Sequence, residues 1–320
     1  MSTAPTEAKG GTELICANLH KALPELTSQV QIIMSRPEQV TLEDKPRILW
    51  LQDLPQDPAS ACLRDKSYRT QFNRIVFCSH WQQQQYQQYL GIPYSEGVVI
   101  KNAVPFREAT FPKPRVNDGK LKFIYTSTPH RGLAILAAAA DALSKIRQDW
   151  ELHVYSSFKI YGWEGADAQF EPLYTLLRNN PCVVYHGTQP NDVVREALQT
   201  SHVFTYPSIY AETSCMAIQE ALMSGCLAIT TNFGALPETC AEWAWMFPFD
   251  ERPELLIHRT LAAMQRALDT YDDQLIQEQL RVQSLYYQQF YAFEGRVPTW
   301  KRLLEIVINE GTPVQKLIIE

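Results

Sequence analysis

The chain has 320 residues, of which 45% are apolar and 20% are charged, and its formal net charge is −6. This composition is typical of an ordinary globular protein, and the length favours two domains over one compact core. The acidic balance provides no electrostatic basis for binding nucleic acid and no polybasic membrane patch, so small molecules are the expected partners.

Neither a secretory signal nor a membrane span is predicted. The N-terminus lacks the signal-peptide pattern, and the longest apolar stretch, LAILAAAADAL at 133–143, is too short to cross a bilayer. The seven cysteines are widely spaced and include no C-x-x-C pair, which is typical of reduced thiols. The seven histidines have no metal-binding spacing, so no metal is expected. We therefore expect a cytoplasmic protein of undetermined oligomeric state.

Short apolar runs alternate with helix-sized segments along the chain. The predicted strands are 29–34, 47–51, 74–78, 97–100, 121–126, 151–156, 182–187, 202–207 and 226–231, and the predicted helices are 12–24, 80–90, 131–147, 169–179, 192–200 and 214–224. This alternation predicts an α/β protein built from βαβ units with parallel sheets. Residues 104–120 break the rhythm with three prolines and no periodicity, which is typical of a linker.

Ligands of open α/β sheets bind where strands lead into helices, and three such junctions carry unusual residues. The first is KGGTEL at 9–14. Gly10 and Gly11 would allow a ligand to approach the backbone, and Thr12 could cap the helix. The spacing is not G-x-G-x-x-G, so a nicotinamide-type site is not predicted.

The second junction is YTSTPHRGL at 125–133. Thr128 can cap a helix that begins with Pro129, which places His130 and Arg131 in the first turn. Cations there oppose the helix dipole, so their presence indicates a site for an anion. The alternative is that Arg131 faces solvent at small cost.

The third junction contains two carboxylates, Glu212 and Glu220, around the helix start at Thr213, Ser214 and Cys215. Small side chains and helix-terminal amides suit phosphate oxygens. If one helical segment joined the two glutamates, their backbones would lie roughly 12 Å apart, which suits an elongated ligand such as a nucleoside diphosphate sugar. Alternatively, Glu220 is a structural carboxylate paired with a lysine, and Cys215 is a thiol of lowered pKa.

Several features of this region occur together. They are Pro207-Ser208, Glu212-x7-Glu220, Gly225 and GALPET at 234–239, and the chain also contains Gly10-Gly11, IKNAV at 100–104 and Trp300 near its C-terminus. Together they resemble the retaining glycosyltransferases of family 4, which have the GT-B fold. The resemblance is strongest over residues 120–240.

The resemblance implies an α/β, GT-B fold in which two Rossmann-like βαβ domains face a cleft. The implied divisions are an N-terminal domain on the acceptor side at 1–105, a linker at 106–120, a C-terminal donor-binding domain at 121–295, and a helical region at 296–320 that crosses back to the first domain. The N-terminal domain would be shortened, because no strand pattern precedes Gly10.

The resemblance also implies roles for individual residues. Glu212 would contact the transferred sugar, Arg131 the leaving diphosphate and Glu220 the donor ribose, while Gln52 stands where relatives often have histidine. The other implied donor-binding residues are Gly10, Gly11, Ser127, Thr213, Ser214, Cys215, Tyr185, His186 and Gly187, with the loop at 185–188 meeting the nucleobase through backbone groups. Asp53 and Asn102 are implied on the acceptor side, although Asn102 has an alternative role as a simple turn residue.

The implied reaction is metal-independent sugar transfer to a hydroxyl group with retention of configuration. No cofactor is implied; a UDP- or GDP-sugar is the expected co-substrate. The acceptor, whether a glycan, a lipid-linked molecule or a small molecule, is not readable from the sequence. Two alternatives remain at this point: a non-catalytic homologue that binds sugar nucleotides or acts as a scaffold, and an enzyme of the same fold that modifies nucleotide sugars.

Overall fold

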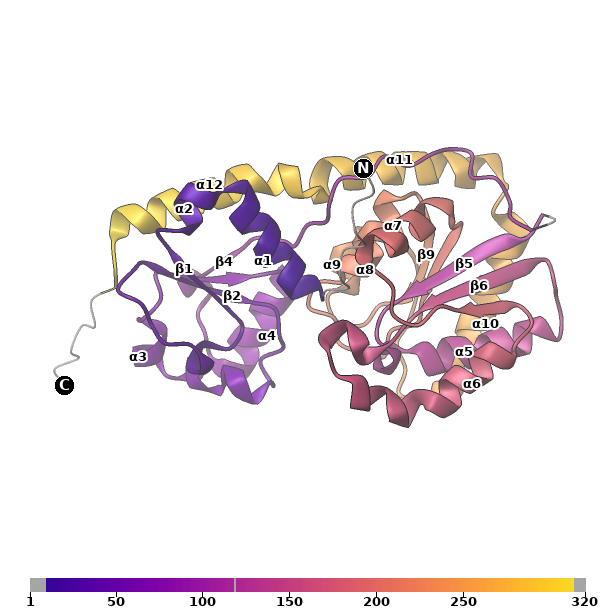
Figure 1. Cartoon of the computed structure of the whole chain (residues 1–320), viewed down its shortest axis with the longest axis horizontal. Helices are drawn as coiled ribbons and strands as arrows, with labels where there is room; N and C mark the ends of the chain where they lie inside the picture. The colour runs from indigo at the N-terminus through magenta and orange to yellow at the C-terminus, as the bar shows by residue number, and fades with distance from the viewer. Residues whose placement is uncertain (1–9, 118, 314–320) are drawn as a thin grey trace. The chain divides into compact units, whose positions relative to one another are not determined.

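The computed structural model describes residues 10–117 and 119–313. They form two units, each with its own parallel sheet (Figure 1). The smaller unit contains Gly11–Ala103 and the C-terminal helix that begins at Phe293, and the larger unit contains Val104–Ala292. A strand in the segment before Gly10 would lie outside the described residues.

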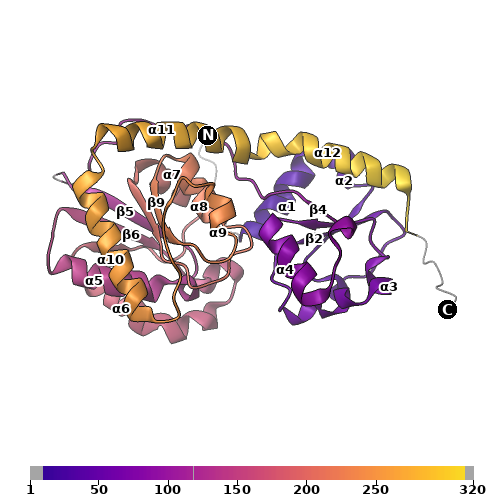
Figure 2. The ribbon, with the colours of Figure 1, turned by 180° about the vertical axis from the view of Figure 1, so that it is seen from behind.

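The smaller unit has a four-stranded sheet in the order β1-β2-β3-β4. Its strands are β1 (Gln31–Met34), β2 (Arg47–Leu51), β3 (Arg74–Phe77) and β4 (Gly97–Val99), and its helices are α1 (Gly11–Ala22), α2 (Pro24–Thr27), α3 (Lys66–Arg69), α4 (His80–Leu90) and α12 (Phe293–Glu310). Helices α1, α2 and α12 lie on one side of the sheet, and α3 and α4 on the other (Figures 1 and 2). Coverage of both faces explains why the strands are continuous apolar runs.

Helix α12 is joined to the smaller unit by aromatic packing. Trp300 of α12 lies against Trp50 of β2 with 4.3 Å between ring centroids, and both side chains are buried. Helix α12 therefore packs onto the sheet of the smaller unit, although nearly the whole larger unit lies between them in the sequence.

The larger unit has a six-stranded parallel sheet in the order β10-β9-β8-β5-β6-β7. Its strands are β5 (Leu121–Thr126), β6 (Trp150–Tyr155), β7 (Val183–Tyr185), β8 (Val203–Tyr206), β9 (Leu227–Thr231) and β10 (Trp245–Phe247). Read from β7, this is the 3-2-1-4-5-6 order of a Rossmann fold. The predicted strands correspond to β1–β9, whereas β10 was not predicted.

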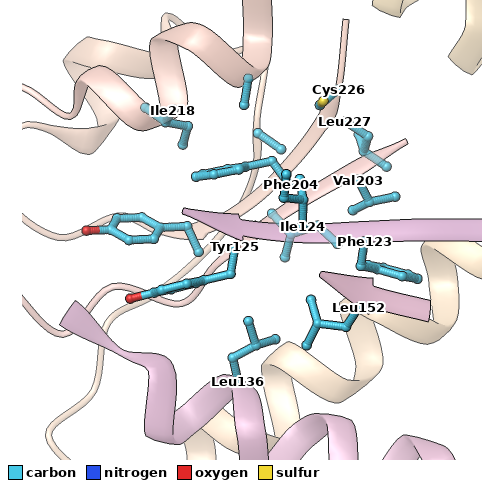
Figure 3. Packing of buried hydrophobic residues seen from close by; sticks show 14 of the residues in the cluster. Phe123, Ile124, Tyr125, Leu136, Leu152, Val203, Phe204, Ile218, Cys226 and Leu227 are labelled. Atoms are coloured by element: carbon cyan, nitrogen blue, oxygen red, sulfur yellow. The ribbon is translucent and has the colours of Figure 1, made fainter. Parts of the chain in front are cut away.

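Helices cover both faces of this sheet. They are α5 (Leu133–Ser144), α6 (Glu171–Asn179), α7 (Asn191–Thr200), α8 (Met216–Met223), α9 (Leu236–Cys240), α10 (Pro253–Thr270) and α11 (Gln274–Tyr291). Helices α5, α6 and α10 lie on one side of the sheet, and α7, α8 and α11 on the other (Figure 2). Tyr125 of β5 points toward Leu136 of α5, whereas Phe204 of β8 lies on the side of Ile218 of α8 (Figure 3).

The predicted linker at 106–120 is wrong, because this segment is part of the larger unit. Lys113 is buried, and its ammonium group donates to the carbonyl oxygen of Ser201 at 2.6 Å. Phe111 packs over Gly225, where an added Cβ would lie 2.4 Å from its ring. The prolines prevent regular structure in this segment, but its side chains anchor it to the sheet and helices beneath.

Candidate functional site

The strand order of the larger sheet reverses beside β5. The chain moves from β5 to β6 and β7 on one side, and then returns to β8 on the other side of β5. In open α/β sheets, ligands bind at the carboxyl ends of the two strands that flank such a switch point. The loops that follow β5 and β8 are therefore the candidate site, and they contain Arg131 and Glu212.

The loop after β5 differs from its predicted form. Pro129–Arg131 make a separate 3-10 turn, and α5 begins only at Leu133, so His130 and Arg131 are not in its first turn. Gly132 separates the two helices with φ +116°, and an added Cβ would lie 2.1 Å from the carbonyl oxygen of Pro207. This close approach brings the loop after β5 against the loop after β8.

Arg131 and Glu212 form an ion pair at the switch point. Arg131 Nη1 donates to Glu212 Oε1 at 2.6 Å, the Tyr206 hydroxyl donates to the same oxygen at 2.5 Å, and the guanidinium lies 4.3 Å from the centre of the Tyr210 ring. The side chains are only 23% and 4% exposed, so the alternative of a solvent-facing Arg131 is wrong. Burial opposes the charge on Arg131, but Glu212 outweighs it and holds the pKa of Arg131 well above its usual value.

The GALPET segment fixes the backbone of Glu212. Ala235 N–H donates to the Glu212 carbonyl oxygen at 2.7 Å. Gly234 has φ +64°, and a Cβ there would lie 2.6 Å from both the nitrogen and the oxygen of Glu212. Glycine is therefore required at 234 both for its backbone conformation and for this close contact.

Glu212 and Glu220 do not belong to one helix. Helix α8 begins at Met216, with Cys215 as its N-cap, so Glu212 lies in the preceding loop with Thr213 and Ser214. The predicted backbone separation, which assumed a continuous helix, therefore does not apply. Cys215 is buried, and burial together with Glu212 raises the pKa of its thiol well above the usual value, so a reactive thiol of lowered pKa is wrong.

Glu220 of α8 is paired, but with an arginine rather than a lysine. Arg195 Nε of α7 donates to Glu220 Oε1 at 2.9 Å, and Arg195 Nη1 donates to Asp192 Oδ1 at 3.2 Å. The Arg195 side chain is 10% exposed and that of Glu220 is 18% exposed. Sequence reasoning missed Arg195; the i, i+3 spacing of Asp192 and Arg195 was its only signal.

Three buried polar atoms near the ends of β5 and β6 have no hydrogen-bond partner among the described residues. They are Thr128 Oγ1, His130 Nδ1 and Ser156 Oγ. Thr128 was predicted to cap a helix, but its side chain makes no capping bond. Buried polar groups are normally satisfied, so unsatisfied atoms in the loops that follow β5 and β6 are a feature that a polar ligand would explain.

The predicted nucleobase loop follows β7. Tyr185 ends this strand, and its hydroxyl donates to the carbonyl oxygen of Ser156 at 2.7 Å. His186 lies 2.9 Å from His153 between ring nitrogens, and Gly187 has φ +65°. Ser127 lies directly after β5, where its N–H donates to the Tyr155 carbonyl oxygen at 3.2 Å. These residues share the carboxyl edge of the sheet with Arg131.

The predicted residues of the smaller unit form a second group. Asn102 Nδ2 donates to Gln52 Oε1 at 2.7 Å, and Gln52 Nε2 donates back at 3.4 Å, so Asn102 is more than a turn residue. The Asp53 carbonyl oxygen accepts from Gln82 and Tyr86.

The double glycine is placed at the start of α1. Gly10 is buried immediately before this helix, and Gly11 is its first residue. Thr12 is therefore inside the helix and does not cap it.

Residues 10–117 and 119–313 contain neither a cluster of metal ligands nor a membrane-spanning helix. Within these ranges, no three histidine, cysteine, aspartate or glutamate side chains are grouped so that they could hold a metal ion. No helix in the same part of the chain combines the length and the apolar character needed to cross a bilayer.

Comparison with known proteins gives one family and many similar folds. The family described as "Glycosyl transferases group 1" matches residues 106–270, just over half of the chain. No curated protein matches the sequence.

Among solved structures, a glycosyltransferase from Rickettsia africae is 15% identical with a TM-score of 0.65, over 97% of this chain and 85% of that one. Sucrose-phosphate synthase from Thermosynechococcus elongatus is 14% identical with a TM-score of 0.67, over 94% and 79%. Anabaena HepE in complex with UDP and glucose is 13% identical with a TM-score of 0.59, over 82% and 72%. These likenesses confirm the GT-B fold, and the matched family confirms sugar transfer as the class of activity. The chain belongs to the group 1 glycosyl transferases.

Proposed function

We propose that this chain transfers a sugar from a nucleotide-sugar donor to a hydroxyl acceptor with retention of configuration, as in glycosyltransferase family 4. The observation that carries the proposal is the Arg131–Glu212 pair at the switch point of the larger sheet, next to the N-terminus of α8. A cation, a carboxylate and helix-terminal amides are the groups that a sugar diphosphate requires.

Arg131 would stabilise the leaving diphosphate. A guanidinium has five N–H donors. In Arg131 one N–H of Nη1 donates to Glu212, so a phosphate would accept from the remaining N–H groups. Charge that develops on the diphosphate during bond breaking is then met by a cation that is already fixed in place. The partial burial of Arg131 makes this interaction stronger than it would be in water.

Glu212 would contact the hydroxyl groups of the transferred sugar. Tyr206 and Arg131 both donate to its Oε1, which leaves Oε2 as the oxygen that can accept from a ligand. Glu220, held by Arg195 through its Oε1, would accept from the ribose hydroxyls in the same way. Each carboxylate is thus oriented through one oxygen and would bind the donor through the other.

The unsatisfied atoms of Thr128, His130 and Ser156 support a polar ligand between Arg131 and the loop at 185–188. That loop would meet the base, as the resemblance implies. Among the similar folds, HepE is described with UDP-glucose, and a pneumococcal O-GlcNAc transferase with UDP and GlcNAc. We therefore propose a UDP-sugar as the first donor to test.

The test is release of nucleoside diphosphate from a panel of UDP- and GDP-sugars, with candidate glycan, lipid-linked and small-molecule acceptors. We expect binding and release with at least one donor, and loss of release in Glu212→Gln. The control is Glu196→Gln, which changes an exposed glutamate of α7. Failure of the wild-type chain to bind any nucleotide sugar would contradict the proposal.

The second candidate is a non-catalytic homologue that binds nucleotide sugars. It is favoured by Gln52, which stands where the resemblance expects histidine and whose amide is held by Asn102. A glutamine positions hydroxyl groups but does not carry a proton at neutral pH. Binding without any release over long incubation would favour this candidate, whereas release that Glu212→Gln abolishes would reject it.

A further inference from the structure

A hydrogen-bonded chain of side chains runs along β6 to the end of β7. Glu151 Oε1 lies 2.8 Å from His153 Nε2, and His153 Nδ1 lies 2.9 Å from His186 Nε2. The His186 ring stacks on Tyr155 with 4.3 Å between centroids and 5° between planes. Glu151, His153 and Tyr155 alternate along β6, so all three project from the same face of the sheet.

The direction of each hydrogen bond follows from the charge on Glu151. Burial raises the pKa of Glu151, but hydrogen bonds from Asn117 and His153 outweigh it, and the pKa lies below its usual value. An ionised carboxylate only accepts, so His153 Nε2 must carry the proton that it donates. Burial lowers the pKa of His153, so its ring is neutral and Nδ1 is an acceptor.

The same reasoning extends to His186. Because His153 Nδ1 accepts, His186 Nε2 must donate and therefore carries the proton. Burial is the first cause that lowers the pKa of His186 to about 4, and His153 and Lys122 add to the effect. A neutral ring with its proton on Nε2 has an unprotonated Nδ1. No hydrogen bond to that nitrogen occurs among the described residues.

We propose that the Glu151–His153 relay fixes His186 in the Nε2–H tautomer, so that its Nδ1 accepts a hydrogen bond from the imide N–H of a uracil base. The relay itself follows from the geometry, and the identity of the ligand rests on the proposed function. His186 contacts the donor in this proposal, whereas Glu151 and His153 are positioning residues that act through it.

The surroundings of His186 suit such a ligand. His186 follows directly after β7, at the carboxyl edge of the sheet, and Gly187 continues the chain in a left-handed conformation with φ +65°. The buried Thr188 Oγ1 in the same loop has no partner among the described residues. A second polar atom of this loop is thus available to the same ligand.

A hydrogen-bond acceptor at His186 Nδ1 would discriminate between uracil and cytosine, which have nearly the same shape. Position 3 of uracil is an N–H donor, whereas position 3 of cytosine is a lone pair that would face the lone pair of Nδ1. A site with a fixed hydrogen-bond acceptor discriminates more strongly than a purely apolar pocket, because the wrong base leaves buried polar groups of both the site and the ligand unpaired. We therefore expect UDP to bind at least tenfold more tightly than CDP.

The first test measures the tautomer in the ligand-free protein by nitrogen-15 NMR of its histidines at pH 7.5. We expect His186 with a proton on Nε2 and none on Nδ1, and a shift of this population in Glu151→Gln, because glutamine can donate to His153 and reverse the relay. The control is Glu171→Gln, which removes an exposed carboxylate paired with Arg178. A wild-type His186 that is charged or protonated on Nδ1 overturns the proposal, even if Glu151→Gln fails to fold.

The second test compares UDP and CDP binding by calorimetry. His186→Phe keeps an aromatic ring on Tyr155 but removes both nitrogens, so the preference for UDP should fall by about tenfold while Glu171→Gln retains it. Equal affinity of the wild-type chain for UDP and CDP would reject base recognition by His186 and leave the proposed function standing. Binding of neither nucleotide would also reject uracil recognition by His186, and the proposed function would fall with it if GDP and the panel of nucleotide sugars did not bind either.

Discussion

Arg131 and Glu212 come from loops that follow two different strands, and they meet with 2.6 Å between Nη1 and Oε1. They are brought together because β5 and β8 are neighbours in the sheet, although 76 residues of the chain lie between the end of β5 and the start of β8. The pair therefore depends on the doubly wound topology rather than on any local motif. The pair also links stability to function, because removal of either side chain leaves the other as an unpaired charge.

Arg131→Ala should reduce both stability and turnover. Loss of the guanidinium leaves the buried carboxylate of Glu212 without its cation, which costs about 3 kcal/mol in the free energy of unfolding. Denaturant unfolding would measure this cost. The control is Arg178→Ala, which breaks the exposed pair with Glu171 and should change stability by less than about 1 kcal/mol. Equal effects of the two variants would contradict the structural role of Arg131.

Glu220→Ala should weaken donor binding and leave the rate of the bound complex nearly unchanged. Its proposed contacts are to the ribose, which does not change during the reaction, so KM should rise about tenfold or more at constant kcat. Steady-state kinetics with the donor as the varied substrate would measure both constants. Glu196→Ala on the neighbouring helix is the control. A normal KM with a collapsed kcat would show that Glu220 acts on the reacting atoms instead.

Gly234→Ala should damage the site beyond its effect on backbone conformation. Gly234 and Gly91 both have positive φ, but an added Cβ would meet Glu212 at 2.6 Å in the first case and no atom within 4 Å in the second. The left-handed backbone conformation should cost each variant about 1 kcal/mol of stability, and the clash with the Glu212 backbone should add to this cost in Gly234→Ala. Only Gly234→Ala should also lower release of nucleoside diphosphate. Equal activity of the two variants would mean that the Glu212 backbone can move without consequence.

Stability should fall as the pH is lowered from about 6.5 to about 4. Burial lowers the pKa of His130, His186 and His202 to about 4 each, whereas unfolded histidines titrate near 6.5. The folded pKa is depressed, so in this window the unfolded chain binds more protons and the stability present above pH 6.5 is lost on acidification. On unfolding near pH 5, these three histidines should bind about three protons from the buffer. Calorimetry in buffers of different ionisation enthalpy would count them, and an uptake of zero would contradict the assignment.

The parallel sheets could be predicted because buried strands are largely apolar runs, as in RILWL and LKFIYT. Strand β10 is also apolar, but its three residues, WMF, are too few to identify a strand, and its place follows from pairing with β9. Helix α8 was predicted to begin at 214, two residues before its observed start at Met216, because nothing in the run from 212 to 215 forbids a helix. Tertiary contacts of Glu212 with Tyr206 and Ala235 hold that run in a non-helical loop.

The candidate site residues Glu212, Arg131 and Glu220 could be named from the sequence, whereas their partners could not. The pairing of Glu212 with Tyr206 and of Glu220 with Arg195 depends on which strands and helices become neighbours. The alternative of a solvent-facing Arg131 could not be rejected from the sequence for the same reason. A cation at a helix terminus usually faces water, and here a separate 3-10 turn directs it against a buried carboxylate instead.

The packing of Trp300 against Trp50 also has a consequence for the order in which the protein can fold during synthesis. The ribosome releases β1–β4 well before α12, so the sheet of the smaller unit waits for its covering helix while Val104–Ala292 of the larger unit is being made. All strands of the larger sheet lie within Val104–Ala292, so this unit can fold once α11 has emerged. A nascent chain stopped before Phe293 would therefore hold the strands and helices of the larger unit together with a smaller unit in which Trp50 lacks its partner Trp300.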